Sequence, residues 1–181
     1  MDRYRQDNGS YCVDITVKEF RQLYDSRDPS PFHDRDLDEA LVHYVVMSCE
    51  EIGEDTNIKI VITGYNKNDQ QQQSDFQVAF HQFFEHEVRA VHNELKFLFR
   101  QGRVSLTLGI GFLMICVFLA FRVGDLDVFG RVVHEGLIIM GWVALWKPLN
   151  IFLYEWWPYR RKMNVYKRLS EIEIEFKESI E

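Results

Sequence analysis

The sequence predicts an α+β membrane protein in which a transmembrane helical hairpin is inserted into a small cytoplasmic domain. Two long apolar segments, 104–121 and 129–146, lie in the second half of the chain, and strand-like segments lie near both ends. Residues 1–103 hold 12 Lys or Arg and 19 Asp or Glu, which accounts for the whole formal net charge of −7. An acidic first half argues against nucleic acid as a partner, since phosphates require a basic surface.

Residues 1–103 are predicted to form most of the cytoplasmic domain, because they begin without the apolar core of a signal peptide. Residues 11–18 alternate as a half-buried strand does, and the more continuously apolar 57–65 predicts a central strand. Between them we expect a short helix at 19–24 and a longer one that begins at Asp36, with Glu39 completing a capping box. Ser74 with Gln77 predicts a third helix, whose apolar stripe continues toward the first span.

Residues 104–122 are predicted to be the first transmembrane helix, because its 18 uncharged residues suffice to cross a hydrocarbon core of about 30 Å. Residues 123–128 are a short external turn, and 129–148 are the return helix, which Pro148 breaks or kinks. Residues 149–169 then form an interfacial or cytoplasmic helix. The alternation of "EIEIEF" within 170–181 predicts a third strand that returns to the sheet of the cytoplasmic domain.

Aromatic and basic residues after the return helix are typical of a membrane interface, where indole and phenol rings lie at the headgroup level. The predicted interface anchors are Lys147, Tyr154, Trp156, Trp157, Arg160, Arg161 and Lys162. Lys and Arg residues precede the first predicted span and follow the second, whereas the two Arg of the intervening turn are offset by two Asp. The positive-inside rule therefore predicts that both termini are cytoplasmic.

His134 and Glu135 lie one to two turns into the return helix, where an ionisable side chain is costly and is by default a candidate for function. At the headgroup level, Glu135 is simply favoured by the helix dipole. In an oligomer, it can instead line an ion path. Small residues allow close helix approach either between chains or within one hairpin, at Ser105, Gly109, Cys116, Gly136, Gly141 and Ala144.

The remaining polar clusters do not match known catalytic or metal motifs. His81, Glu85 and His92 share one helical face, but a solvated face with a Glu85–Arg89 pair explains them better than a metal ion. No nucleophile, base and orienting residue can be assembled, so we expect neither an enzyme nor a bound cofactor or metal. The three cysteines are expected to be unpaired.

At "DPSPFHDRDLD" and at "HEGLIIMGWVALWKPLNIFLYEWWP" the chain resembles a group of uncharacterised bacterial inner-membrane proteins with two spans. The resemblance covers most of the chain and implies a bacterial cytoplasmic membrane, but no activity. The sequence thus predicts a homo-oligomeric scaffold or regulatory protein that contacts the lipid bilayer and other membrane or cytoplasmic proteins. The alternative is an oligomeric ion channel or transport component with Glu135 near the ion path.

Overall fold

The computed structural model describes residues 4–7, 9–28, 35–53, 56–64, 70–123 and 127–178. The chain forms two compact units. The sheet unit combines Met1–Ala90 with Lys162–Glu181, and the hairpin unit is Val91–Arg161. The predicted α+β class is confirmed, because the chain has a four-stranded mixed sheet together with long helices.

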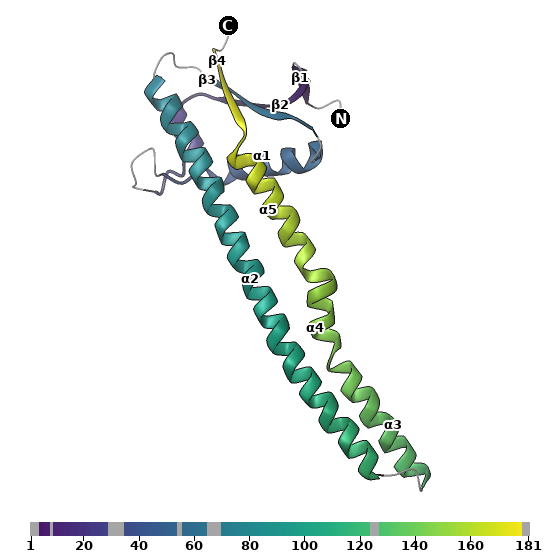
Figure 1. The fold of residues 1–181 in the computed structure, drawn as a ribbon. Coiled ribbons are helices and arrows are strands. Elements are labelled where there is room, and N and C mark those ends of the chain that lie inside the picture. The colour runs from purple at the N-terminus through teal and green to yellow at the C-terminus, as the bar shows by residue number, and fades with distance from the viewer. Residues whose placement is uncertain are drawn as a thin grey trace. The chain divides into compact units, whose positions relative to one another are not determined.

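The sheet has the strand order β1-β2-β3-β4 (Figure 1). Strand β2 (Ser10–Val17) pairs in parallel with β3 (Ile58–Gly64), which pairs in parallel with β4 (Glu173–Glu178). The predicted return of the C-terminal segment to the sheet is therefore confirmed. The most continuously apolar strand, β3, is central, as its sequence predicted.

Strand β1 (Arg5–Asp7) is the strand that the sequence analysis missed, so the sheet has four strands rather than the three predicted. It pairs antiparallel with the start of β2. Its sequence, "RQD", has no apolar residue and gives no alternation signal. The Asn8-Gly9 pair is a hairpin turn signal that could have revealed the strand. Gly9 has a φ of 81°, a backbone conformation that glycine adopts without strain.

The helices of the sheet unit begin at positions other than those predicted. Helix α1 (Glu39–Ile52) is capped by Asp38, whose carboxylate accepts from the backbone N–H groups of Ala40 and Leu41 at 3.0 and 3.1 Å. The predicted cap at Asp36 is wrong, because Asp38 satisfies the free N–H groups of the first turn. The short helix expected at 19–24 is the 3-10 helix η1 (Phe20–Leu23).

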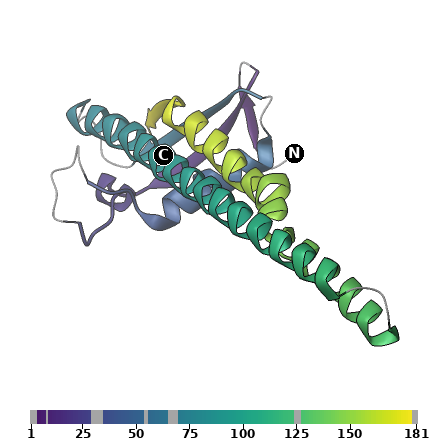
Figure 2. The same cartoon turned by 60° about the horizontal axis from the view of Figure 1, so that its bottom comes forward.

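Helix α2 (Gln70–Val123) begins four residues before the predicted cap at Ser74 and continues without interruption through Gly102. Gln77 therefore does not take part in a capping box. Its side-chain amide instead donates to the carbonyl of Ile174 at 3.1 Å, and so links α2 to strand β4. Helix α5 (Trp156–Ser170) also contributes to the sheet unit, and Figure 2 shows the parts of α2 and α5 that belong to this unit, 70–90 and 162–170, on one face of the sheet.

The core of the sheet unit lies between the apolar face of the sheet and these helices. Phe76, Phe80 and Phe84 recur at every fourth residue of α2, so they form one stripe, and each is at most 1% exposed. The ring of Phe76 meets Phe176 of β4 edge-on, and Phe84 lies 5.7 Å from Tyr166 of α5. The sheet and α1 supply further buried apolar residues, among them Val13, Ile15, Ile60, Ile62, Ile174, Leu41, Val45 and Ile52.

The opposite face of the sheet carries a cross-strand ion network. The Lys59 ammonium on β3 lies 2.8 Å from a carboxylate oxygen of Asp7 on β1 and 2.9 Å from one of Glu175 on β4. The Lys59 side chain is only 13% exposed. Hydrogen bonds from Lys59 lower the pKa of both carboxyl groups, and the same bonds raise the pKa of Lys59. One cation thus links the two edge strands across the sheet.

Acid is expected to destabilise the sheet unit through this network. Because the pKa values of Asp7 and Glu175 are lowered by folding, their stabilisation is present above their unfolded pKa of about 4 and is lost as the pH falls through the folded values. Lys59→Met removes the shared cation, so thermal unfolding followed by circular dichroism should depend less on pH below about 4 in the variant. An equally steep acid dependence in both proteins would contradict this role of Lys59.

In the hairpin unit, α2 turns back into α3 (Val128–Val143), which is followed by α4 (Trp146–Asn150), the π-helical segment η2 (Ile151–Glu155) and then α5. The return helix is interrupted at Ala144 and Leu145 rather than at Pro148 itself. Pro148 has no N–H for the carbonyl four residues earlier, which is that of Ala144. Regular hydrogen bonding resumes with Leu149, whose N–H donates to Leu145 at 3.1 Å.

Candidate functional site

Two helices are long and apolar enough to cross a membrane, by length and composition: Gln70–Val123 and the nearly continuous helical run Val128–Ser170. Only 17% of the most apolar 18-residue window in each is buried within the chain. The core helix of a soluble protein would instead be mostly buried. Large exposed apolar side chains are therefore concentrated on these windows, including Leu108, Met114, Ile115, Phe118, Ile139 and Trp142.

The two helices of the hairpin unit pack closely where glycines face the partner helix. A Cβ atom at Gly109 would lie 3.0 Å from the backbone oxygen of Ala144, and one at Gly141 would lie 2.7 Å from a methyl carbon of Leu113. At Gly102 it would lie 2.9 Å from the Ile151 side chain. The carbonyl of Ala144 has no helical N–H donor because residue 148 is a proline, and this carbonyl lies against Gly109 of the other helix.

These contacts distinguish the two uses of small residues that the sequence left open. Gly109, Gly141 and Ala144 take part in packing within the hairpin, and Cys116 is buried there. By contrast, a Cβ atom at Gly136 would meet nothing within 4 Å. Gly111 is equally open, although the sequence analysis did not select it. The small residues therefore serve mainly the hairpin itself, and those at 111 and 136 lie on surfaces left uncovered by this chain.

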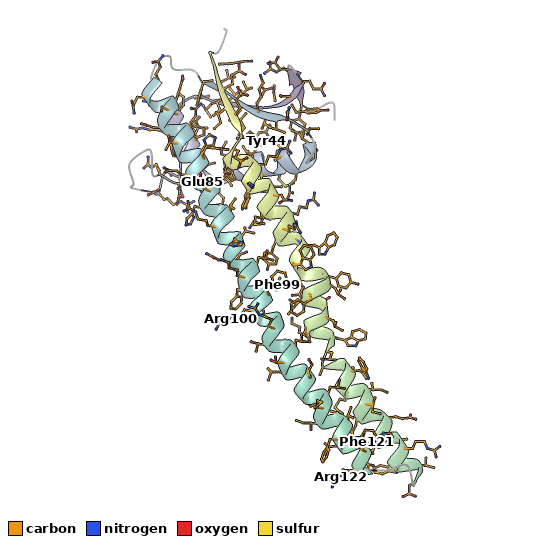
Figure 3. The ribbon with its side chains drawn as sticks, in the orientation of Figure 1. Tyr44, Glu85, Phe99, Arg100, Phe121 and Arg122 are labelled. Carbon is orange, nitrogen blue, oxygen red and sulfur yellow. The ribbon has the colours of Figure 1, made fainter. Side chains whose placement is uncertain are left out.

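The antiparallel contacts also locate His134 and Glu135 along the hairpin. Gly141 lies against Leu113 and Cys116, so Glu135, six residues nearer the turn, lies opposite the last turn of α2. Figure 3 shows Phe121 and Arg122 in that last turn. Glu135 is exposed, and His134 is half-buried and has an interaction partner. This position is close to the turn rather than at the centre of the hairpin.

The predicted interface anchors lie on the segment 147–162, which begins one residue before Pro148. Tyr154 and Trp157 are 68% and 64% exposed, and Lys147 and Arg161 are also exposed. Trp156 is half-buried, and its indole N–H donates to the carbonyl of Phe152 at 3.0 Å. The other two anchors make cation–π contacts: Arg160 lies over the ring of Trp156, and Lys162 lies over the ring of Tyr166. Lys162 already belongs to the sheet unit.

The π-helical segment η2 was not predicted. Its geometry widens the helix by one residue per turn, and such segments recur at functional sites. In this chain the amide of Asn150 donates to the Glu155 carboxylate at 2.7 Å across the segment. Ile151, at its start, is fully buried against Gly102. The nearby Pro148 indicated an irregular helix in the sequence, but it did not indicate that the segment after it would be π-helical.

The other polar cluster considered from the sequence has a structural explanation. The His81 ring nitrogen Nε2 lies 3.0 Å from the carbonyl oxygen of Ile172, so this side chain is not simply solvated as predicted. The predicted ion pair between Glu85 and Arg89 is present at 3.5 Å. Among the described residues, no group of three or more His, Cys, Asp or Glu is placed to hold a metal ion.

The chemistry available on the described surface of the hairpin unit is thus apolar contact along its length, with cations and aromatic rings at the end opposite the turn. Comparisons with protein-family models, with curated proteins and with solved structures find no match to this chain.

Proposed function

We propose that the protein is an integral membrane scaffold or regulatory protein whose hairpin anchors the sheet unit at the cytoplasmic face of a bacterial inner membrane. One observation carries this proposal: the chain itself buries only 17% of its two most apolar windows. Apolar surfaces of this extent are unfavourable in water, and helices of this length can bury them in the hydrocarbon core of a bilayer. The hairpin spans the bilayer twice, with both termini in the cytoplasm and the turn outside.

The charge distribution supports this orientation. Residues 94–103 and 147–161 hold six Lys or Arg and two Glu, whereas residues 122–135, around the turn, hold two Arg and three Asp or Glu. The basic end is therefore the cytoplasmic one, by the positive-inside rule. Self-association of the chain is part of the proposal, because the open positions Gly111 and Gly136 let a second copy approach the hairpin closely.

A scaffold is distinguished from an ion channel by its behaviour in proteoliposomes. We expect the wild-type protein to pass no cations across a range of pH values, with the oligomer demonstrated by its mass in nanodiscs. Glu135→Gln should change stability by no more than about 1 kcal/mol, as expected for a charge near a helix end. Its matched control is Asp127→Asn, which removes an exposed carboxylate nearer the turn. If the wild-type protein passed cations, and Glu135→Gln changed that flux whereas Asp127→Asn did not, the scaffold proposal would be wrong and the protein would be an ion channel.

A further inference from the structure

Exposed aromatic and basic side chains gather at the end of the hairpin unit opposite the turn. The stacked rings of Phe99 and Phe152, 6.1 Å apart, fix the register of the two helices there. Phe97, which is 68% exposed, therefore lies at about the level of Tyr154 and Trp157 on the return helix. We name this set of residues the interface belt: Lys96, Phe97, Arg100, Arg103, Tyr154, Trp157, Arg160 and Arg161.

The basic side chains of the interface belt are exposed, and Arg160 also lies over the ring of Trp156. In Figure 3, Phe99 points toward the return helix, whereas the neighbouring Arg100 points away from it. Among the described residues, no carboxylate lies within 4.0 Å of the guanidinium groups of Arg100, Arg103, Arg160 or Arg161. The nearby Glu155 carboxylate accepts from the neutral amide of Asn150. These guanidinium groups are therefore available to an external anion.

The aromatic side chains of the interface belt place those cations at a defined depth. Exposed Tyr and Trp side chains prefer the level at which hydrocarbon meets headgroups. Arg100 on α2 lies three residues, about one helical turn, from Phe97 on the side toward the turn, and Arg160 on α5 lies equally far from Trp157 on the side away from the turn. Long Arg side chains can cover that axial distance, so their guanidinium groups reach the phosphate layer.

We propose that the interface belt binds the headgroups of anionic phospholipids, and so gives the protein a lipid preference at its cytoplasmic side. This inference rests on the proposed membrane insertion of the hairpin. The guanidinium group donates in pairs to phosphate oxygens, and the excess of basic over acidic residues at this end complements an anionic leaflet. The turn end, where carboxylates outnumber Arg, has the opposite balance and shows no such preference.

Tryptophan quenching by brominated lipids measures this preference directly. In a Trp142→Phe/Trp146→Phe background, the fluorescence comes from Trp157, which belongs to the interface belt, and from the adjacent Trp156. Bilayers contain either brominated phosphatidylglycerol or brominated phosphatidylcholine at increasing mole fraction. We expect phosphatidylglycerol to quench more strongly at equal fraction. Arg100→Gln/Arg160→Gln should reduce the relative affinity for phosphatidylglycerol at least tenfold, since each basic residue near an anionic surface contributes about a fivefold preference.

The matched control is Arg122→Gln/Arg131→Gln, which removes the same charge at the turn end and should leave the preference unchanged. Equal quenching by the two lipids in the unsubstituted belt, or an equal loss in both double variants, would overturn the lipid preference and leave membrane insertion intact. Absence of quenching by either brominated lipid would instead overturn the proposed membrane insertion, and the lipid preference with it.

Discussion

Phe80→Ala is expected to destabilise the sheet unit by about 3–5 kcal/mol, the usual cost of removing a fully buried aromatic ring. Phe80 is 1% exposed, and its ring lies 4.8 Å from that of Phe84 and 5.8 Å from that of Phe76. Truncation therefore removes apolar burial and leaves a cavity in the middle of the stripe that α2 presents to the sheet. Urea unfolding of the purified protein, followed by circular dichroism, gives the change in free energy.

Val78→Ala is the control for that change, because Val78 lies on the same helix but is 43% exposed. We expect the control to alter the free energy of unfolding by less than about 0.5 kcal/mol. A similar small effect of both substitutions would show that the stripe of Phe76, Phe80 and Phe84 is not the core of the sheet unit.

Gly141→Leu is expected to force apart the two helices of the hairpin unit and to cost about 1–3 kcal/mol, as overpacking of a close interface does. The Cβ atom of the new side chain would lie 2.7 Å from a methyl carbon of Leu113 and 3.3 Å from the backbone Cα of the same residue. The methyl group can rotate away, but the backbone cannot. The midpoint of thermal unfolding in detergent should therefore fall relative to the wild type.

Gly136→Leu is the matched control, since it adds the same side chain to the same helix where a Cβ atom would meet nothing within 4 Å. Its midpoint in monomeric detergent complexes should remain close to that of the wild type. If Gly136→Leu lowered the midpoint as much as Gly141→Leu, the proposed close packing through Gly141 would be incorrect.

Much of the sheet unit could be predicted because three of the four strands, β2, β3 and β4, carry their own pattern. The alternation in β2 and β4 and the continuous apolar run of β3 reflect which faces are buried, so they are readable without the fold. Strand β1 was missed because three polar residues owe their conformation to pairing with β2 and to the Lys59–Asp7 ion pair. That information lies in another part of the chain.

The helix boundaries were harder to predict from the sequence, because they too depend on contacts with other parts of the chain. Both Asp36 and Asp38 can cap a helix, but Asp36 lies in a segment held by backbone contacts, including the bridge between Tyr24 and Leu37, and Asp38 caps the first turn. Similarly, Pro148 identified an irregularity, but the missing hydrogen bond belongs to Ala144, one helical turn earlier. Local sequence therefore indicated the presence of these features more accurately than their position.

The candidate site was predictable in composition but not in arrangement. Apolar length identified both membrane-compatible helices, and the aromatic and basic residues remain predicted interface anchors. Composition does not distinguish Gly141, which contacts the other helix, from Gly136, which does not, because that difference depends on the register of the hairpin. The same register determines that Glu135 lies opposite the last turn of α2, which could not be derived from its own segment.

Reporter fusions provide the most direct test of a hairpin that crosses the bilayer twice. A reporter active only outside the cytoplasm should be active when inserted within residues 124–128 and inactive when fused after residue 181. A reporter active only in the cytoplasm should give the reverse result at both sites. Full-length fusion proteins must be recovered from the membrane fraction in each case. Cytoplasmic activity from the insertion within 124–128 would contradict the spanning hairpin.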